Sequence, residues 1–183
     1  MHFLHTVFPT RGGFEDVALQ DCIPEESIMT FEFREFVESL EPKFKALMAM
    51  TPVKYSTLPR EMPERGIYLF SEGDQHLYVG RTNRIRRRLA GHCRPSSTHF
   101  SATFAFRVAR EETGLLKAAY STTGSRAALV TDSKFGSAFC RAKARLAGMD
   151  LRFVEEADPI RQALLEIYVA VTLKTPYNDF DNH

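Results

Sequence analysis

The chain has 183 residues, enough for one domain with a real hydrophobic core. Its 24 Lys and Arg nearly balance its 23 Asp and Glu, so the formal net charge of +1 gives no overall basic footprint. The cysteines, Cys22, Cys93 and Cys140, are odd in number and unrelated in spacing, which indicates neither a disulfide framework nor a zinc site. With no basic leader and no long apolar run, we expect a soluble cytoplasmic protein with no membrane contact.

Residues 1–60 are expected to form an N-terminal helical extension. Its apolar side chains recur at helical spacing: Phe33, Phe36, Val37, Leu40, Phe44, Leu47 and Met48. Pro42 interrupts this stripe, where it either kinks the helix or starts a second one. We expect the extension to pack on a domain formed by residues 61–183.

A β-hairpin follows, because apolar and other side chains alternate over residues 66–71 and 75–80 around the polar loop 72–74. Pairing the two residues that flank the loop places Tyr68 directly opposite Tyr78, so that both phenols share one face of the sheet. The plainer interpretation of these tyrosines is a favourable cross-strand aromatic pair.

The next helix carries two ionisable side chains on its inner stripe. Ile85, Leu89, Arg88 and His92 fall on one face at helical spacing. A helix that only needed to pack would place aliphatic residues at 88 and 92, because an unpaired cation facing a core is costly. We therefore expect Arg88 and His92 to meet an anion.

Three other arginines of this helix, Arg84, Arg86 and Arg87, point away from the inner stripe. A solvated charged face and contact with phosphates explain them about equally well. Residues 77–110 contain no Asp or Glu, and the resulting local positive potential suits a phosphate backbone. The arginines of this stretch are Arg81, Arg84, Arg86, Arg87, Arg88, Arg94, Arg107 and Arg110.

An inserted segment at about 98–147 separates this helix from the last part of the domain. Periodicity leaves residues 104–109 open between a strand and a buried helical turn. Asp132 or Ser133 is expected to cap a later helix of the insertion. Residues 150–155 alternate like a strand, and we expect them to be the third strand of the sheet.

The final helix is expected to begin with Asp158 as its N-cap and Pro159 at its first position. The helix has one apolar stripe, made of Ile160, Ala163, Leu164, Ile167 and Val171. Its remaining surface is apolar too, through Leu165, Val169, Ala170 and Leu173, so we expect the helix to be largely buried. Glu166 is the only carboxylate after the first turn and lies between apolar neighbours, so it needs a cation. An arginine such as Arg88 and a metal ion both remain open as that partner.

These positions, in this order, resemble the GIY-YIG nuclease family from residue 66 to about residue 178. The second triplet reads Tyr-Val-Gly, with Val where the family has Ile. The residues that carry the resemblance are Gly66, Ile67 and Tyr68; Tyr78, Val79 and Gly80; Arg88; His92; Glu166; and Asn178. The expected fold is therefore an α/β domain with a small, mostly antiparallel three-stranded sheet flanked by helices.

The resemblance implies metal-dependent hydrolysis of DNA phosphodiester bonds. One carboxylate at the site argues for a single divalent ion, and Mg²⁺ (or Mn²⁺) fits because it keeps most of its waters. Glu166 would be its protein ligand, and no small-molecule cofactor is expected. The other roles that the resemblance implies are a general base for Tyr68, support for Tyr78, phosphate binding for Arg88, orientation or proton relay for His92 and a hydrogen bond in the metal shell for Asn178.

Arg81, Arg84, Arg86 and Arg87 are the expected DNA contacts, and the N-terminal extension is an alternative element for positioning DNA or a second subunit. Three other functions stay open at this stage: a nucleic-acid-binding module without turnover, a structural partner protein and a nuclease that cuts RNA. The oligomeric state is open as well.

Overall fold

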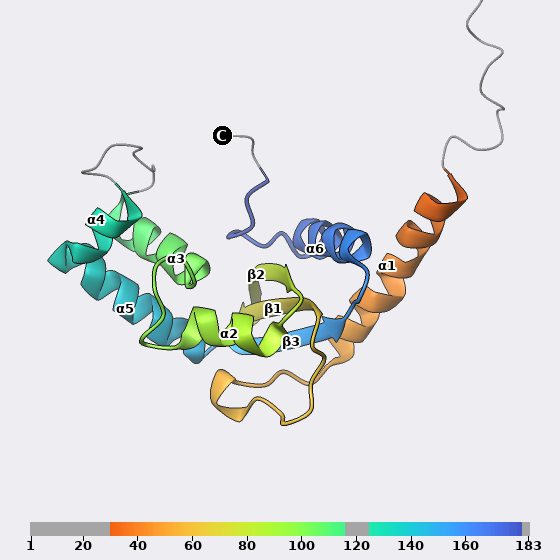
Figure 1. The fold of residues 1–183 in the computed structure, drawn as a ribbon, viewed down its shortest axis with the longest axis horizontal. Coiled ribbons are helices and arrows are strands. Elements are labelled where there is room, and N and C mark those ends of the chain that lie inside the picture. The colour runs from red at the N-terminus through yellow and green to blue at the C-terminus, as the bar shows by residue number, and fades with distance from the viewer. Residues whose placement is uncertain (1–29, 116–124, 181–183) are drawn as a thin grey trace, which may run out of the picture.

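A computed structural model describes residues 30–115 and 125–180, and it has three layers. In the middle lies a three-stranded antiparallel sheet in the order β2-β1-β3 (Figure 1). Its strands are β1 (Gly66–Glu72), β2 (Gln75–Thr82) and β3 (Asp150–Glu155). The predicted α/β class and the expected third strand are confirmed.

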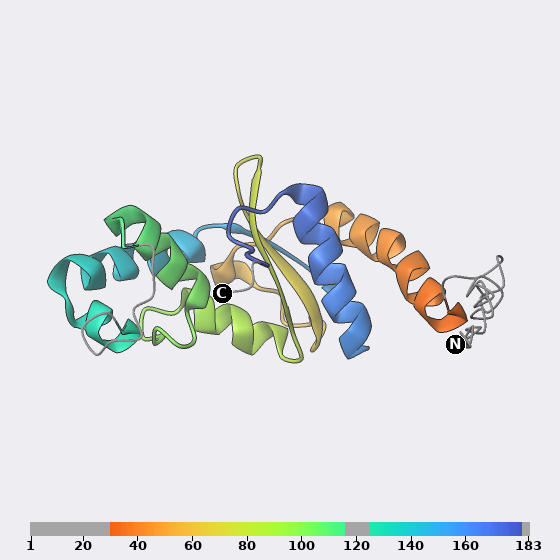
Figure 2. The same cartoon turned by 90° about the horizontal axis from the view of Figure 1, so that it is seen from above.

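Helices cover both faces of the sheet (Figure 2). The helices on one side are α2 (Ile85–Cys93), α3 (Thr103–Thr113), α4 (Arg126–Thr131) and α5 (Ser133–Ala147). The other side carries α1 (Phe31–Ala49) and α6 (Pro159–Leu173). A short 3-10 helix, η2 (Tyr55–Thr57), lies in the segment that leads from α1 to β1. The insertion is thus helical where the structure describes it, including residues 104–109.

Strand alternation divides the core between the two faces. Tyr68 and Phe70 point to the side of α2, α3 and α5, where the core is largely aromatic. Ile67 and Leu69 point to the other side and pack against Val79, against Leu47 of α1 and against Leu165 and Val169 of α6. Because every second side chain of a strand points the same way, β1 serves both cores at once.

The predicted register of the hairpin is wrong by two positions. Tyr68 lies opposite Gly80, and Tyr78 lies opposite Phe70. The register shifts between Phe70 and Ser71, where Leu77 stands as an extra residue of β2. Since the shift is even, both phenols still share a face, and their ring centroids are 6.3 Å apart.

Helix α1 runs through Pro42 without a break. The carbonyl of Glu38 loses its helical partner there, but Glu38 is exposed and water can replace the lost bond. The second half of α1 packs on the core through Leu47, whereas Phe31 and Phe33 in the first half are exposed. Residues 1–29 of the predicted extension, with Cys22, lie outside the described residues.

Helix α6 is less buried than the sequence predicts. Its buried residues are Gln162, Leu165, Val169 and Ala170. Ile160, Ile167 and Val171 of the predicted stripe are 53%, 45% and 66% exposed. The helix is apolar nearly all round, so its periodicity contained no polar face that could fix its orientation. The cap was predicted correctly, since Asp158 accepts hydrogen bonds from the backbone N–H groups of residues 160 and 161.

Within the described part of the chain, no helix combines the length and the apolar character that crossing a bilayer requires.

Gly66 begins β1 where β3 comes closest. Its φ is +144°, and a Cβ there would lie 2.0 Å from the carbonyl oxygen of Val154. We expect Gly66→Ala to lower the free energy of unfolding in urea by at least about 2 kcal/mol, because backbone atoms must move apart. The control is Gly73→Asn in the hairpin turn, with φ +57° and open space, where we expect less than about 1 kcal/mol. Equal effects of the two substitutions would contradict this account.

Candidate active site

The side chain of Tyr68 is the centre of the candidate site. It is 1% exposed, and its hydroxyl lies 3.0 Å from Nε2 of His92 and accepts a hydrogen bond of 3.2 Å from Nε of Arg88. Arg88 and His92 are one turn apart on α2, so both reach back to the same phenol on β1. They meet a phenol where the sequence predicted an anion.

Gly80, the last residue of the second triplet, makes room for this phenol. It lies opposite Tyr68 in the hairpin, and a Cβ at this position would be 2.4 Å from the Tyr68 hydroxyl oxygen. Any larger residue would therefore push the ring away from Arg88 and His92. Glycine is required here by the close approach of a side chain, whereas Gly66 is required by backbone conformation.

The protons of the buried cluster follow from burial and charge. Burial, and to a smaller extent the charge of Arg88, lowers the pKa of His92 to about 3, so its imidazole is neutral at pH 7. Burial and the neighbouring Tyr78 phenol raise the pKa of Tyr68 well above its usual value, although Arg88 opposes this rise. The cluster at neutral pH is thus a protonated phenol between one cation and one neutral imidazole.

Arg88 is held in place by residues that the sequence did not single out. Its guanidinium donates to the Ser101 carbonyl oxygen at 3.0 Å and to Oγ1 of Thr103 at 3.0 Å, in addition to Tyr68. These contacts fix the guanidinium between α2 and the start of α3. Neither Ser101 nor Thr103 belongs to a recognisable pattern in the sequence, so only the fold reveals them.

Tyr78 completes the aromatic surroundings of Tyr68. Its ring stacks on Phe104 of α3 with centroids 4.7 Å apart and an interplanar angle of 21°. Its phenol lies close enough to Tyr68 to influence the pKa of that residue. Tyr78 is only partly buried, so it lies between Tyr68 and the surface.

Glu166 approaches from the other face of the sheet, on α6. Its Oε2 accepts a hydrogen bond from Nε of Arg81 at 2.9 Å, and its side chain is 20% exposed. Burial raises the pKa of Glu166, while the charges of Arg81 and Arg88 oppose that rise. The sequence left an arginine and a metal ion open as the partner of Glu166. The partner in the structure is an arginine, but it is Arg81 of β2 and not Arg88.

The edge of the sheet brings these groups together. β2 is an edge strand, so Gly80 and Arg81 lie where side chains from both faces meet. Arg88 lies on the face of Tyr68, yet its charge acts on both Tyr68 and Glu166. The phenol and the carboxylate thus lie on opposite faces of β2, with Arg88 beside the first and Arg81 paired with the second.

Asn178 holds the same edge strand. Its side-chain amide exchanges two hydrogen bonds with the backbone of Val79, at 2.9 and 2.8 Å, and its Oδ1 also accepts from Thr175 at 2.9 Å. The backbone N–H of Tyr177 adds a bond to the Leu77 carbonyl oxygen. These contacts give Asn178 a positioning role on β2, and the hydrogen bond in a metal shell stays a prediction.

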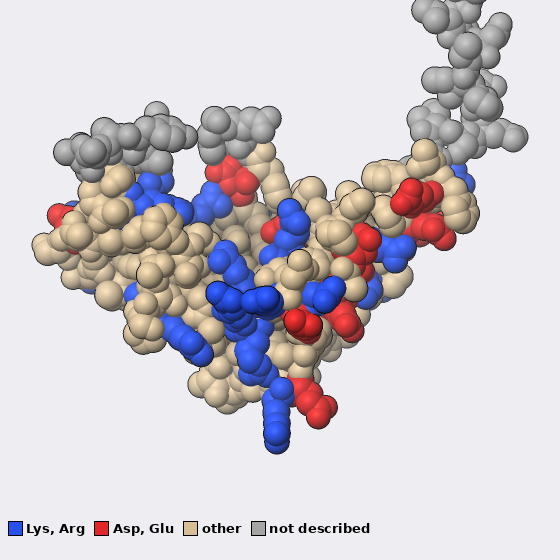
Figure 3. Space-filling model, in the orientation of Figure 1, with Lys and Arg blue, Asp and Glu red and all other residues tan. Residues whose placement is uncertain are grey.

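The arginines predicted to contact DNA differ in their surroundings. Arg84 and Arg87 are exposed, whereas Arg86 donates to the carbonyl oxygens of Pro59 and Arg60. Arg81 is paired with Glu166. A band of Lys and Arg side chains crosses the middle of the face in Figure 3, over α2. Positive charge thus gathers beside Tyr68, although the net charge of the chain is small.

The donor set for a metal ion is small. Among the residues that the structure describes, no three His, Cys, Asp or Glu side chains group together in a way that could hold an ion. Glu166 is a partly exposed carboxylate with a single arginine partner, and one such oxygen ligand fits an ion that keeps most of its waters. It does not fit a metal that needs a complete protein shell.

Comparison with known proteins identifies no relative, since no family model, no curated protein and no solved structure matches the chain.

The depressed pKa of His92 has a measurable consequence for stability. Above pH 6.5 the imidazole is neutral in both states, so stability is fully present. As the pH falls below 6.5 the unfolded chain takes up a proton that the folded protein refuses until about pH 3, and stability is lost. We expect the wild type to lose about 2 kcal/mol more than His92→Gln between pH 7.5 and pH 5, measured by urea unfolding. Parallel losses in the two proteins would show that His92 titrates normally.

Proposed function

We propose that the protein is a metal-dependent endonuclease of the GIY-YIG type that hydrolyses DNA phosphodiester bonds. The observation that carries the proposal is the buried Tyr68 hydroxyl, which is held by Arg88 and His92 and lies against Gly80 of the edge strand, next to the Arg81 that pairs with Glu166. A core that only needed packing would not bury a phenol, a guanidinium and an imidazole together, because each must be desolvated. Support also comes from the positive charge over α2.

Arg88 is the residue best placed to receive the scissile phosphate. It is partly exposed, and it is fixed by Ser101, Thr103 and Tyr68, so it loses little conformational freedom on binding. A guanidinium also matches the geometry of phosphate oxygens. Its charge would stabilise the extra negative charge of the pentacovalent transition state.

Glu166 would hold Mg²⁺ or Mn²⁺ through one carboxylate oxygen. When bound, the ion would supply positive charge to the phosphate oxygens and to the leaving 3′-oxygen. The pairing of Glu166 with Arg81 would have to open for this, and Arg81 would then be available to a second phosphate. Because the pair is half exposed on the arginine side, opening it costs about 1 kcal/mol or less.

Tyr68 would take the proton of the attacking water by relay. The phenol accepts that proton while its own hydroxyl proton passes to Nε2 of His92, 3.0 Å away, so no free phenolate forms. A bound phosphodiester favours this route over a phenolate, because its negative charge raises the pKa of His92 and disfavours a second anion. Nδ1 of His92 is buried and has no hydrogen-bond partner among the described residues, so none of them stabilises the imidazolium on that side and the proton is readily returned.

The test is cleavage of supercoiled plasmid with Mg²⁺, scored as nicked and linear products. We expect Tyr68→Phe and Glu166→Gln each to lower the rate at least about 100-fold, since the first removes the relay and the second the metal ligand. Glu38→Gln, an exposed substitution on α1, is the control and should cleave normally.

Two outcomes would contradict the proposal. Cleavage that persists in Glu166→Gln or in a chelator would remove the metal role of Glu166. Binding without cleavage, for the wild type with either ion, would favour the nucleic-acid-binding module. An RNA substrate should be tested beside the plasmid, because no described contact discriminates a 2′-hydroxyl.

Arg81 should compete with the metal ion for Glu166. In the absence of DNA we expect Arg81→Gln to bind Mn²⁺ about two- to fivefold more tightly than the wild type, because the carboxylate no longer has to leave an ion pair. Electron paramagnetic resonance of free Mn²⁺ measures this without any cleavage. Lys45→Gln, which breaks an exposed pair with Glu41, is the matched control. An affinity that is unchanged in Arg81→Gln would place the ion elsewhere.

A further inference from the structure

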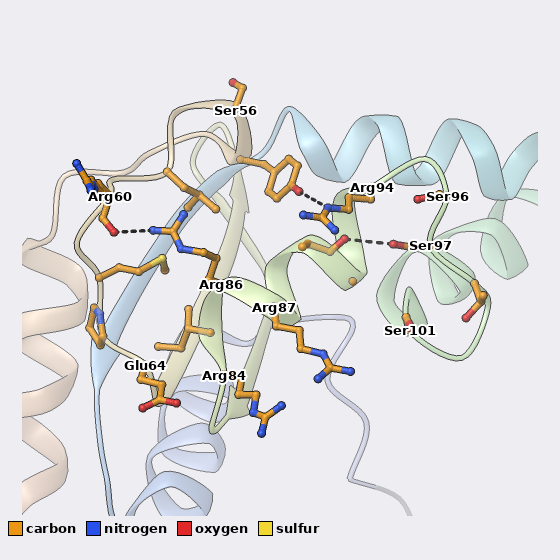
Figure 4. Close-up of a pocket in the computed structure, with 18 residues that line it drawn as sticks. Ser56, Arg60, Glu64, Arg84, Arg86, Arg87, Arg94, Ser96, Ser97 and Ser101 are labelled. Carbon is orange, nitrogen blue, oxygen red and sulfur yellow. Dashed lines mark hydrogen bonds between the residues drawn. The ribbon is translucent and has the colours of Figure 1, made fainter.

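A pocket of about 960 Å³ lies beside the candidate active site, between α2 and the segment that precedes β1 (Figure 4). One wall is formed by residues 55–64 and the other by α2 and residues 94–101. Arg86 fastens the two walls together, because its guanidinium donates to the carbonyl oxygens of Pro59 and Arg60. The two walls of the pocket are thus held together by hydrogen bonds within the folded domain.

The α2 wall carries a row of arginines. Arg87 and Gly91 lie on α2, and Arg84 and Arg94 flank the helix at its two ends, so the three arginines are spread along about 15 Å of this wall. Figure 4 shows Arg84 and Arg87 extending from α2 to the same side. Glu64 is the only acidic residue among the described residues that line the pocket. A row of this kind matches consecutive phosphates better than a single anion.

The opposite wall adds apolar side chains to the lining, beside Ser56, Arg60 and Glu64. Tyr55, Leu58 and Met62 line it, and all three are partly buried against the core. The Tyr55 hydroxyl accepts a hydrogen bond of 3.2 Å from Nε of Arg94, which fixes the ring at the end of the arginine row. Charged and apolar walls that face each other suit a ligand with alternating phosphates and flat apolar groups.

The pocket leads to Arg88. A second hollow of about 330 Å³ shares Arg84, Arg87, Gly91 and Ser101 with the first and is also lined by Arg88. Ser101 marks the junction, because its carbonyl oxygen accepts the hydrogen bond from Arg88. A chain of phosphates that starts at Arg88 can therefore continue along α2 into the larger pocket.

We propose that this pocket binds unpaired nucleotides of the strand whose phosphate lies at Arg88, so that the substrate is DNA with a single-stranded segment next to the cut. The inference rests on the proposed function. Stacked and paired bases cannot offer their faces to Tyr55, Leu58 and Met62, whereas unpaired bases can, and single-strand binding sites combine such apolar platforms with basic grooves. Continuous duplex would use only the arginines.

The test is fluorescence anisotropy in chelator with three labelled DNAs of matched sequence: a single strand, a blunt duplex and a duplex with an unpaired tail. We expect the wild type to bind the single strand and the tailed duplex roughly tenfold more tightly than the blunt duplex, because stacking adds to phosphate binding. An RNA strand of the same sequence should bind no more tightly than the DNA strand.

Gly91→Glu is the decisive variant. A Cβ at Gly91 meets only Ser101, at 3.6 and 3.8 Å, so a side chain fits there, and it would put negative charge on the arginine row. Affinity for the tailed duplex should fall roughly tenfold or more, and the preference over blunt duplex should disappear. Ala46→Glu adds the same charge to the exposed side of α1 and should have no effect.

Arg87→Gln is the second variant, because it leaves the helix unchanged. It should reduce the salt dependence of single-strand binding by about 0.7 in the log–log slope, as expected for one lost phosphate contact. Arg34→Gln on α1 is its control. If tailed and blunt duplex bind equally well and neither pocket variant changes this, the proposed binding of unpaired nucleotides in the pocket is wrong, even if plasmid is cleaved. If the tailed duplex binds more tightly and the pocket variants weaken this binding, the proposed pocket is supported even if no DNA is cut. Tighter binding of the RNA strand than of the DNA strand would contradict the assignment to DNA.

Discussion

The close contact between the Tyr68 phenol and the backbone at Gly80 is the constraint on which the site depends. Without a side chain at residue 80 the ring can lie over the neighbouring strand, and its hydroxyl then reaches the inner face of α2. Arg88 and His92 dock on that hydroxyl, which fixes the rotation of α2 about its axis. Through Ser101 and Thr103 the same guanidinium fixes the start of α3. The Tyr68 hydroxyl oxygen thus connects the sheet to α2 and, through Arg88, to the loop before α3 and the start of that helix.

The charges of the site are arranged to receive negative charge. Arg88 is a permanent cation beside a phenol that stays protonated and an imidazole that stays neutral. Glu166 is the carboxylate that the described part of the site contributes, and the charges of Arg81 and Arg88 both lower its pKa against the effect of burial. Two cations therefore face one anion at the β2 edge. Surface water can compensate such an excess, but a bound phosphodiester would do so better, because it brings charge and fixed acceptors together.

The sequence predicted those parts of the fold that local patterns determine. The strands, the capped start of α6 and the shared face of the two phenols follow from alternation and from Asp158 and Pro159, which act within a few residues. The extra residue at Leu77 could not be predicted, because a bulge leaves alternation intact on either side of it. The exposure of Ile160, Ile167 and Val171 on α6 could not be predicted either, because a helix with apolar residues all round has no polar face to mark its solvent side. Pairing of Arg81 with Glu166 depends on contacts between distant segments, which no local pattern encodes.

Helix α2 contributes to the inner core, to the candidate site and to the wall of the pocket. Ile85 and Leu89 are fully buried, Arg88 reaches Tyr68, and Arg84 and Arg87 line the pocket. Under the proposed function, a strand bound along the outer side of α2 would lie at a fixed distance from Arg88, because hydrogen bonds to Tyr68, Ser101 and Thr103 hold that guanidinium in place. The path of the strand and the position of the scissile phosphate would then depend on the same short helix.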